Sequence, residues 1–202
     1  MNFKHILLAS ATAAVMFACG EKKTETKAVD STGTEVTYTV DAAASKVEWK
    51  GVMAGVKAHY GTVNVKDGSV TVKGSQITAG TFNVDLASIA PLDSTYDEKN
   101  TKEGLITHLK DTAFFNVKEF PTATFVIKKV SGNSATGDLT VRGKTNEETV
   151  TDIVVTADSA NVNATGKLVF DRQKYGVAFS TGSKDYVIND NIELNITLVG
   201  KK

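Results

Sequence analysis

Ile192-Glu193-Leu194-Asn195-Ile196-Thr197-Leu198-Val199, close to the C-terminus, alternates apolar with mostly polar residues. Side chains on a β-strand point alternately to its two faces, so this spacing produces one apolar face and one mostly polar face. Such strands belong to antiparallel sheets that cover a core on one side and meet water on the other. The segment therefore predicts a half-buried antiparallel strand and favours an all-β fold.

The same alternation recurs along the chain. It appears at Val36, Tyr38 and Val40, at Val47 and Trp49, at Val63 and Val65, at Phe82, Val84 and Leu86, and at Phe125 and Ile127. Turn signals interrupt the pattern at Asp67-Gly68, Ser131-Gly132-Asn133 and Thr181-Gly182-Ser183, where glycine or asparagine accepts a positive φ. We expect a tight hairpin at Asp67-Gly68, and we expect Pro91 and Pro121 to lie in loops.

One segment departs from the strand pattern. Leu105, Ile106 and Leu109, between Asp97 and Asp111, have the spacing of a short amphipathic helix. Closing the sheet into a barrel removes the unpaired edges that so many strands would otherwise leave. We therefore predict a single antiparallel β-barrel of about eight strands with one short helix, whose interior is either filled by side chains or holds one small ligand.

The N-terminal segment has the features of an export signal. Lys4 and His5 precede an uncharged run at 6–18, which is shorter than the roughly 20 apolar residues of a membrane-spanning helix. Met16-Phe17-Ala18-Cys19 resembles the lipobox of bacterial lipoproteins, which implies cleavage before Cys19 and acylation of that residue, for example with palmitate. Cys19 is the only cysteine and so has no partner for an intramolecular disulfide. An ordinary secreted protein with an idle thiol is the alternative.

These features divide the chain into three parts. We predict a lipoprotein signal peptide at 1–18, a lipidated flexible tether at 19–35 and a β-barrel domain at 36–202. The tether has hardly any apolar residue and cannot bury enough surface to fold. Acylated Cys19 makes a membrane the expected partner and the cell envelope the expected location. Gly20, where other lipoproteins carry an aspartate retention signal, favours the outer membrane, with the domain facing the periplasm.

Composition and motifs argue against several classes of function. Lys plus Arg equals Asp plus Glu, at 23 each, so we expect no nucleic-acid partner. His59 and His108 lack the spacing of metal ligands, and we expect no metal site. The sequence contains no Gly-Xaa-Ser-Xaa-Gly elbow, no second thiol and no glycine-rich phosphate loop before a helix, so we expect neither an enzyme nor a cofactor.

Several motifs, in order along the domain, resemble the YceI-like family. They are Tyr38-Thr39-Val40-Asp41 with Ser45-Lys46-Val47-Glu48-Trp49, Gly80-Thr81-Phe82 with Asp85-Leu86-Ala87-Ser88-Ile89, His108-Leu109-Lys110-Asp111-Thr112-Ala113-Phe114-Phe115-Asn116-Val117 with Phe120-Pro121-Thr122-Ala123-Thr124-Phe125, Gly137-Asp138-Leu139-Thr140-Val141-Arg142-Gly143-Lys144-Thr145, and Phe170-Asp171-Arg172-Gln173-Lys174-Tyr175-Gly176. The resemblance covers essentially the whole mature domain. It implies a lipocalin-like antiparallel barrel whose long cavity holds a polyisoprenoid or a similar amphiphile, in a periplasmic or secreted setting.

Large apolar side chains of the domain, together with His108, are candidates for the lining of that cavity. The candidates are Trp49, Phe82, Leu105, His108, Leu109, Phe114, Phe115, Phe125, Phe170 and Phe179. Adjacent residues on an extended chain face opposite ways, so we expect one of Phe114 and Phe115 to face the lumen and the other a different layer. The helix with Leu105 and Leu109 is expected to plug or cap the barrel.

Three functions remain open at this level. The first is a lipid-anchored barrel that stores, shields or transports an isoprenoid-like or other amphiphilic lipid, such as a quinone, in an apolar cavity. The second is a structural or stress-protective envelope protein whose aromatic residues fill the barrel and leave no room for a ligand. The third, and the least favoured, is an enzyme acting on a lipid.

Overall fold

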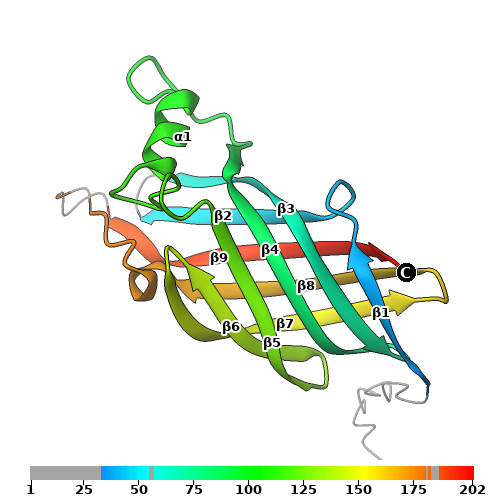
Figure 1. Cartoon of the computed structure of the whole chain (residues 1–202). Coiled ribbons are helices and arrows are strands. Elements are labelled where there is room, and N and C mark those ends of the chain that lie inside the picture. Colours follow the sequence, from blue (N-terminus) through cyan, green and yellow to red (C-terminus); the bar gives the residue numbers. More distant parts are fainter. Residues whose placement is uncertain (1–32, 55–56, 181, 183–186) are drawn as a thin grey trace, which may run out of the picture.

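The structure, a computed structural model, describes residues 33–54, 57–180, 182 and 187–202, and these form mostly strands (Figure 1). The strands are β1 (Glu35–Val40), β2 (Lys46–Ala54), β3 (Lys57–Lys73), β4 (Gln76–Pro91), β5 (Thr122–Ser131), β6 (Ser134–Val141), β7 (Lys144–Ala157), β8 (Asn161–Asp171) and β9 (Val187–Lys201). The helices are α1 (Lys102–Lys110) and a short 3₁₀ turn, η1 (Arg172–Tyr175). This architecture confirms the predicted all-β fold with one short α-helix.

The sheet closes on itself as an antiparallel barrel. β3 pairs with β2 through its N-terminal half and with β1 through its C-terminal half, while β9 pairs with both β1 and β2. β1 and β2 therefore share one position in the ring, and β9, β8, β7, β6, β5, β4 and β3 complete it. The pairing of β3 with β4 closes the ring at eight positions, which confirms the predicted lipocalin-like barrel.

The alternation in sequence decides which side chains face the interior. Ile192 and Leu198 of β9 are buried, while Glu193 and Asn195 between them are exposed. β8, which lies beside β9, alternates without interruption from exposed Asn161 to buried Phe170. The apolar faces of the strands thus meet inside the barrel, as we predicted for 192–199.

Two of the three turn predictions can be compared with the structure. The hairpin at Asp67-Gly68 is wrong, because both residues lie within β3, opposite Asn83 and Phe82, next to a bulge between Val65 and Asp67. A Cβ on Gly68 would lie 2.6 Å from the carbonyl oxygen of Thr81, so this glycine permits a close approach of two strands.

The actual turn between β3 and β4 is Gly74-Ser75, where Gly74 has a φ of 61°. The turn at Ser131-Gly132-Asn133 is confirmed, because it joins β5 to β6 and Gly132 has a φ of 57°. Of the third predicted turn, only Gly182 lies within the described residues.

The two prolines lie at strand ends. Pro121 immediately precedes β5, outside the strand, as we expected. Pro91 is instead the last residue of β4, where it faces Gly61 of β3. Proline lacks an N–H group for the sheet, and a terminal position in a strand tolerates that loss.

The predicted helix is present as α1 at one end of the barrel (Figure 1). The Thr101 side chain accepts a hydrogen bond from the Gly104 N–H at 3.0 Å and caps the start of the helix, while Asp111 is the cap at its end. Leu109 is buried on its inner face. In the described part of the chain, no helix has the length and apolar character needed to cross a membrane.

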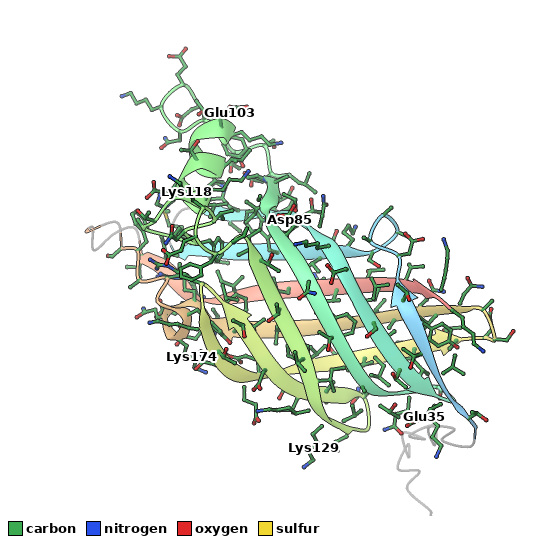
Figure 2. The ribbon with its side chains drawn as sticks, viewed as in Figure 1. Glu35, Asp85, Glu103, Lys118, Lys129 and Lys174 are labelled. Carbon is green, nitrogen blue, oxygen red and sulfur yellow. The ribbon has the colours of Figure 1, made fainter. Side chains whose placement is uncertain are left out.

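The opposite end of the barrel is closed by side chains. Tyr38, Val70, Val72 and Val162 are all at most 2% exposed and fill the barrel near the β3–β4 turn. Glu35 at the start of β1 pairs with Lys73 beside that turn, and Figure 2 places Glu35 and Glu103 of α1 at opposite ends of the molecule. The barrel therefore has a closed end near Glu35 and a mouth beside α1.

Candidate functional site

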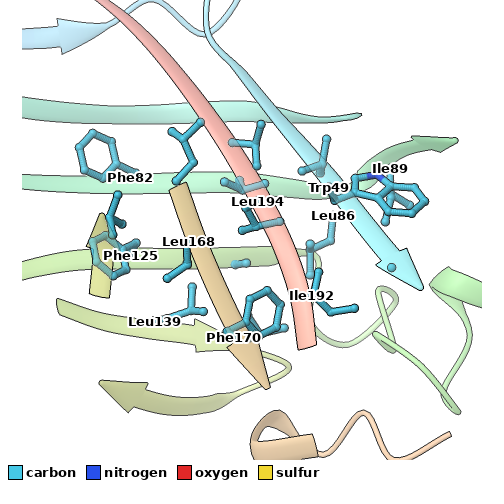
Figure 3. Close-up of a pocket in the computed structure, with 18 of the residues that line it drawn as sticks. Trp49, Phe82, Leu86, Ile89, Phe125, Leu139, Leu168, Phe170, Ile192 and Leu194 are labelled. Carbon is cyan, nitrogen blue, oxygen red and sulfur yellow. The ribbon is translucent and has the colours of Figure 1, made fainter. Parts of the chain in front are cut away.

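The barrel encloses a cavity of about 450 Å³. Strands β2 to β9 all contribute side chains to its wall, together with α1 and the segments that follow α1 and η1. Figure 3 shows Leu86, Leu139, Leu168 and other labelled residues pointing into this shared space from different strands. No Asp, Glu, Lys or Arg occurs among the described lining residues, and the polar side chains there are few. The cavity is suited to an apolar chain.

All ten candidate lining residues lie on the wall of this one cavity. Trp49, Phe82, Phe125 and Phe170 line the barrel wall from β2, β4, β5 and β8. The other six lie around the mouth, namely Leu105, His108 and Leu109 on α1, Phe114 and Phe115 after it, and Phe179 after η1. Their contact with a ligand stays a prediction.

Phe114 and Phe115 both line the cavity, and our expectation that they face different layers is wrong. Residues 112–115 form turns instead of an extended strand, so the rule of alternating faces does not apply. The two rings meet edge to face with centroids 4.9 Å apart, and both side chains are buried. The segment therefore places two aromatic rings at the mouth.

Trp49 presents an apolar surface to the cavity because its polar atom is satisfied elsewhere. Its Nε1 donates a hydrogen bond to the Thr62 carbonyl oxygen at 3.2 Å. The ring lies close to Gly61, where an added Cβ would be 2.8 Å from Cζ2 of Trp49 and 2.8 Å from Cα of Pro91. Glycine at this position allows the indole to approach the backbone closely.

His59 is a lining residue that our candidates from the sequence did not include. Gly61 faces Pro91 across β3 and β4, and continuing this register by two residues brings Asp93 opposite His59. His59 Nδ1 lies 3.2 Å from both carboxylate oxygens of Asp93. These residues are 34 positions apart, so only the register of the two strands could have indicated the pair.

Asp93 is a buried carboxylate with a complete set of donors. Its side chain is 2% exposed and accepts hydrogen bonds from Thr95 Oγ1 and from the Tyr96 hydroxyl, each at 2.9 Å. Burial by itself raises the pKa of Asp93, but the hydrogen bonds from Thr95, Tyr96 and His59 outweigh it and lower the pKa to about 2. Asp93 is therefore ionised at neutral pH.

Tyr96 supports this arrangement from the other side. Its ring stacks on His59, with centroids 5.9 Å apart and planes 18° apart. Burial and the hydrogen bond to Asp93 raise the pKa of Tyr96 to about 12, so its hydroxyl remains a donor.

His108 on α1 has a different environment. Its ring makes edge contacts with Phe179 and Phe114, at centroid distances of 4.3 and 5.4 Å. Burial lowers the pKa of His108 and outweighs the negative charge of Asp111, which by itself would raise it. The lowered pKa favours a neutral imidazole. Within the part of the chain that the structure describes, no group of three or more His, Cys, Asp or Glu residues could hold a metal ion.

Arg172 positions part of the mouth, a role that the sequence reasoning did not assign. It is 3% exposed and donates hydrogen bonds to the carbonyl oxygens of Val177, Phe179, Ile188 and Asn189 and to Asp190. A guanidinium group can satisfy several acceptors at once because its donors form a planar fork. Arg172 thereby fixes the backbone of Phe179 and Ile188, which both line the cavity.

Comparisons with known proteins agree with this fold. The family model for the YceI-like domain matches residues 38–200. A UPF0312 protein of Staphylococcus aureus (strain USA300) is 34% identical over 150 residues, which cover 71% of this chain and 83% of that protein. The crystal structure of Burkholderia cenocepacia BcnA has a TM-score of 0.58 and 25% identity, covering 79% of this chain and 98% of that one.

A second solved structure is a polyisoprenoid binding domain from Saccharophagus degradans implicated in plant cell wall breakdown. It has a TM-score of 0.51 and 14% identity, over 81% of this chain and 97% of that one, and it shows the same fold. The family model covers nearly all of the barrel, from β1 to the end of β9. The chain therefore belongs to the YceI-like family.

Proposed function

We propose that this protein binds an amphiphilic lipid with an isoprenoid-like tail inside its barrel, and that it stores, shields or transports that lipid in the cell envelope. The tail would lie among the aromatic and aliphatic side chains of the cavity, and the head would lie at the mouth beside α1. In the same proposal, acylated Cys19 tethers the domain to a membrane, with the outer membrane and the periplasm as its location.

The observation that carries the proposal is the cavity of about 450 Å³ with a wall of apolar side chains. Burying apolar surface contributes about 25 cal/mol per Å², so a branched hydrocarbon chain gains most of its binding free energy from such a wall. The Saccharophagus degradans domain with the same fold is a polyisoprenoid binding domain, which supports this class of ligand. Membership of the YceI-like family likewise supports a binding role over a catalytic one.

A structural or stress-protective protein without a ligand is the alternative. It requires a barrel filled by its own side chains, and the cavity weighs against that requirement. A cavity of this kind with an apolar wall is costly to leave empty, because its lining lacks contact partners.

Native mass spectrometry of the protein purified from its own host tests the proposal. We expect an adduct that organic solvent extracts as a lipid with an isoprenoid-like tail. A protein that is free of extractable lipid, and that does not bind an added fluorescent polyisoprenoid analogue, would support the ligand-free alternative.

A further inference from the structure

We infer that His59 is the head-group site of the cavity and that it accepts a hydrogen bond from a hydroxyl on an uncharged head, as in a polyprenol or an isoprenoid hydroquinone. The inference rests on the proposed function, since it names the chemistry of the head of that lipid. It is carried by the contacts of His59 and by the charges around it.

The geometry fixes which nitrogen of His59 carries a proton. Asp93 is ionised and can only accept hydrogen bonds, so the Nδ1 atom that lies 3.2 Å from both of its oxygens must be the donor. In the neutral imidazole, Nε2 is then left with a free lone pair and acts as an acceptor. Among the described residues, the hydrogen bonds of the His59 ring are made by Nδ1, so Nε2 stays available to a ligand.

The side chain of His59 lies where a head group would be. It shares a strand face with Val63 and Val65, which also line the cavity, and it is 19% exposed. Its position near the start of β3 places it at the mouth, beside the end of β4. A lipid whose tail fills the barrel would thus bring its head to an acceptor whose orientation is already set by Asp93.

The charges around His59 favour an uncharged head over a phosphate. The described lining contains no Lys or Arg that could neutralise a phosphate, whereas phosphate sites in proteins normally supply such cations. The nearest fixed charge is the negative carboxylate of Asp93, with its side chain 2% exposed. A phosphate would be repelled by Asp93, while a hydroxyl carries no charge and donates directly to Nε2.

His108 is the other histidine in the lining, and within the described chain it has no carboxylate partner that would fix its tautomer. Its ring is held by edge contacts with Phe114 and Phe179, and no carboxylate among the described residues accepts a hydrogen bond from it. Nothing in these contacts selects one of its two tautomers. His108→Phe is therefore a matched control for His59→Phe, because both changes replace a lining imidazole by a ring without polar atoms.

Three probes with the same branched hydrocarbon chain test the inference: phytanol, phytanyl phosphate and phytane. Each competes with a fluorescent isoprenoid analogue for the intact protein. A hydrogen bond contributes only modestly on balance, so we expect phytanol to bind roughly three- to tenfold more tightly than phytane. We expect phytanyl phosphate to bind more weakly than phytanol. A phytyl hydroquinone and its quinone form a third comparison, in which only the hydroquinone can donate to Nε2.

Three variants test whether His59 causes the preference for phytanol over phytane. His59→Phe should bind phytanol and phytane equally, His59→Gln should recover part of the preference because its amide restores an acceptor, and His108→Phe should keep the preference of the parent. Thermal unfolding of each variant confirms that it folds. The inference is overturned if phytanyl phosphate binds most tightly, or if His59→Phe keeps the preference for phytanol.

Binding of a lipid tail and recognition of its head by His59 give different results when they fail. If the parent binds phytane and phytanol equally well, the cavity holds a lipid tail but His59 does not recognise its head. If the parent binds none of the probes, the proposed function itself is wrong.

Discussion

Asp93 shows how a buried carboxylate is kept charged at the mouth of an apolar barrel. Its carboxylate is hidden from water, yet hydrogen bonds from Thr95, Tyr96 and His59 stabilise the ionised form. Removing any one donor would leave the charge less compensated, since burying a charged group is costly unless it is paired and hydrogen-bonded. Asp93 is thus a positioning residue for His59.

The pKa of Asp93 makes a prediction about acid stability. The pKa is lowered from 3.8 to about 2, so ionised Asp93 stabilises the folded state fully above pH 3.8, and this contribution is lost as the pH falls towards 2. A shift of this size corresponds to about 2 kcal/mol. Asp93→Asn should be less stable than the parent at pH 7, and the difference should shrink by about that amount near pH 2, as measured by urea unfolding.

Glu98→Gln, an exposed change in the same loop, serves as the control and should follow the parent. An Asp93→Asn protein whose free energy of unfolding differs from that of the parent by the same amount at both pH values would contradict the prediction.

At the scale of elements, α1 and the turn after it act together as a cap. Leu105, His108 and Leu109 line the cavity from the helix, and Phe114 and Phe115 line it from the turn. Backbone hydrogen bonds join the two parts, because the N–H of Phe115 donates to the carbonyl oxygen of Leu109 at 3.1 Å. The cap therefore contributes aromatic surface to the mouth as one unit.

Replacing both phenylalanines by alanine should weaken binding of a fluorescent polyisoprenoid or quinone analogue, because the tail loses two aromatic contacts. Each buried Phe→Ala change also costs about 3 to 5 kcal/mol of stability, so unfolding must be measured with affinity. Phe114→Leu and Phe115→Leu keep most of the volume and provide the controls. Folded double variants that bind as tightly as the parent would show that these rings serve packing alone.

At the scale of the whole molecule, the chain enters the barrel at the end opposite to the mouth. Glu35 begins β1 beside the closed end, while Glu103 of α1 lies at the other end (Figure 2). We propose that the cavity of the anchored protein opens away from the membrane that holds Cys19. A flexible tether over 19–35 would have an end-to-end distance of roughly 20 Å.

Cys19→Ala tests the anchor itself. Several acyl chains together hold a protein on a bilayer almost permanently, so we expect the parent to remain with membranes after a carbonate wash. The variant should appear as a soluble or unprocessed protein in the same fractionation. If it partitions with membranes like the parent, the lipobox interpretation is wrong.

Spin labels on the lipidated protein in vesicles test the orientation. Cys19 is the only natural cysteine and is acylated in this proposal, so Ser75→Cys and Glu103→Cys each provide a single free thiol for labelling. We expect the label at position 75, near the closed end, to lie closer to the membrane surface than the label at position 103. A relaxation agent bound to the lipid headgroups should therefore enhance the relaxation of the label at position 75 more strongly. Equal values, or a closer label at position 103, would refute this orientation.

The sequence by itself determined six of the nine strands, the helix and the family. Alternation of apolar residues is a local property, and the strand segments at 36–40 and 192–199 follow from it directly. Nine of the ten candidate lining residues are large and apolar, and His108 lies in a family-like motif, so the sequence alone indicated them. Alternation did not predict β7, since most of its side chains are polar and only Val150 is buried.

The tertiary structure decided the features that depend on how distant segments meet. Asp67-Gly68 has the local signal of a turn, but pairing with β4 holds it within a long strand, and the chain turns at Gly74-Ser75. Phe114 and Phe115 face the same cavity because the chain turns there. His59 meets Asp93 only through the register of β3 and β4, since a contact between residues far apart in sequence depends on the pairing of whole strands.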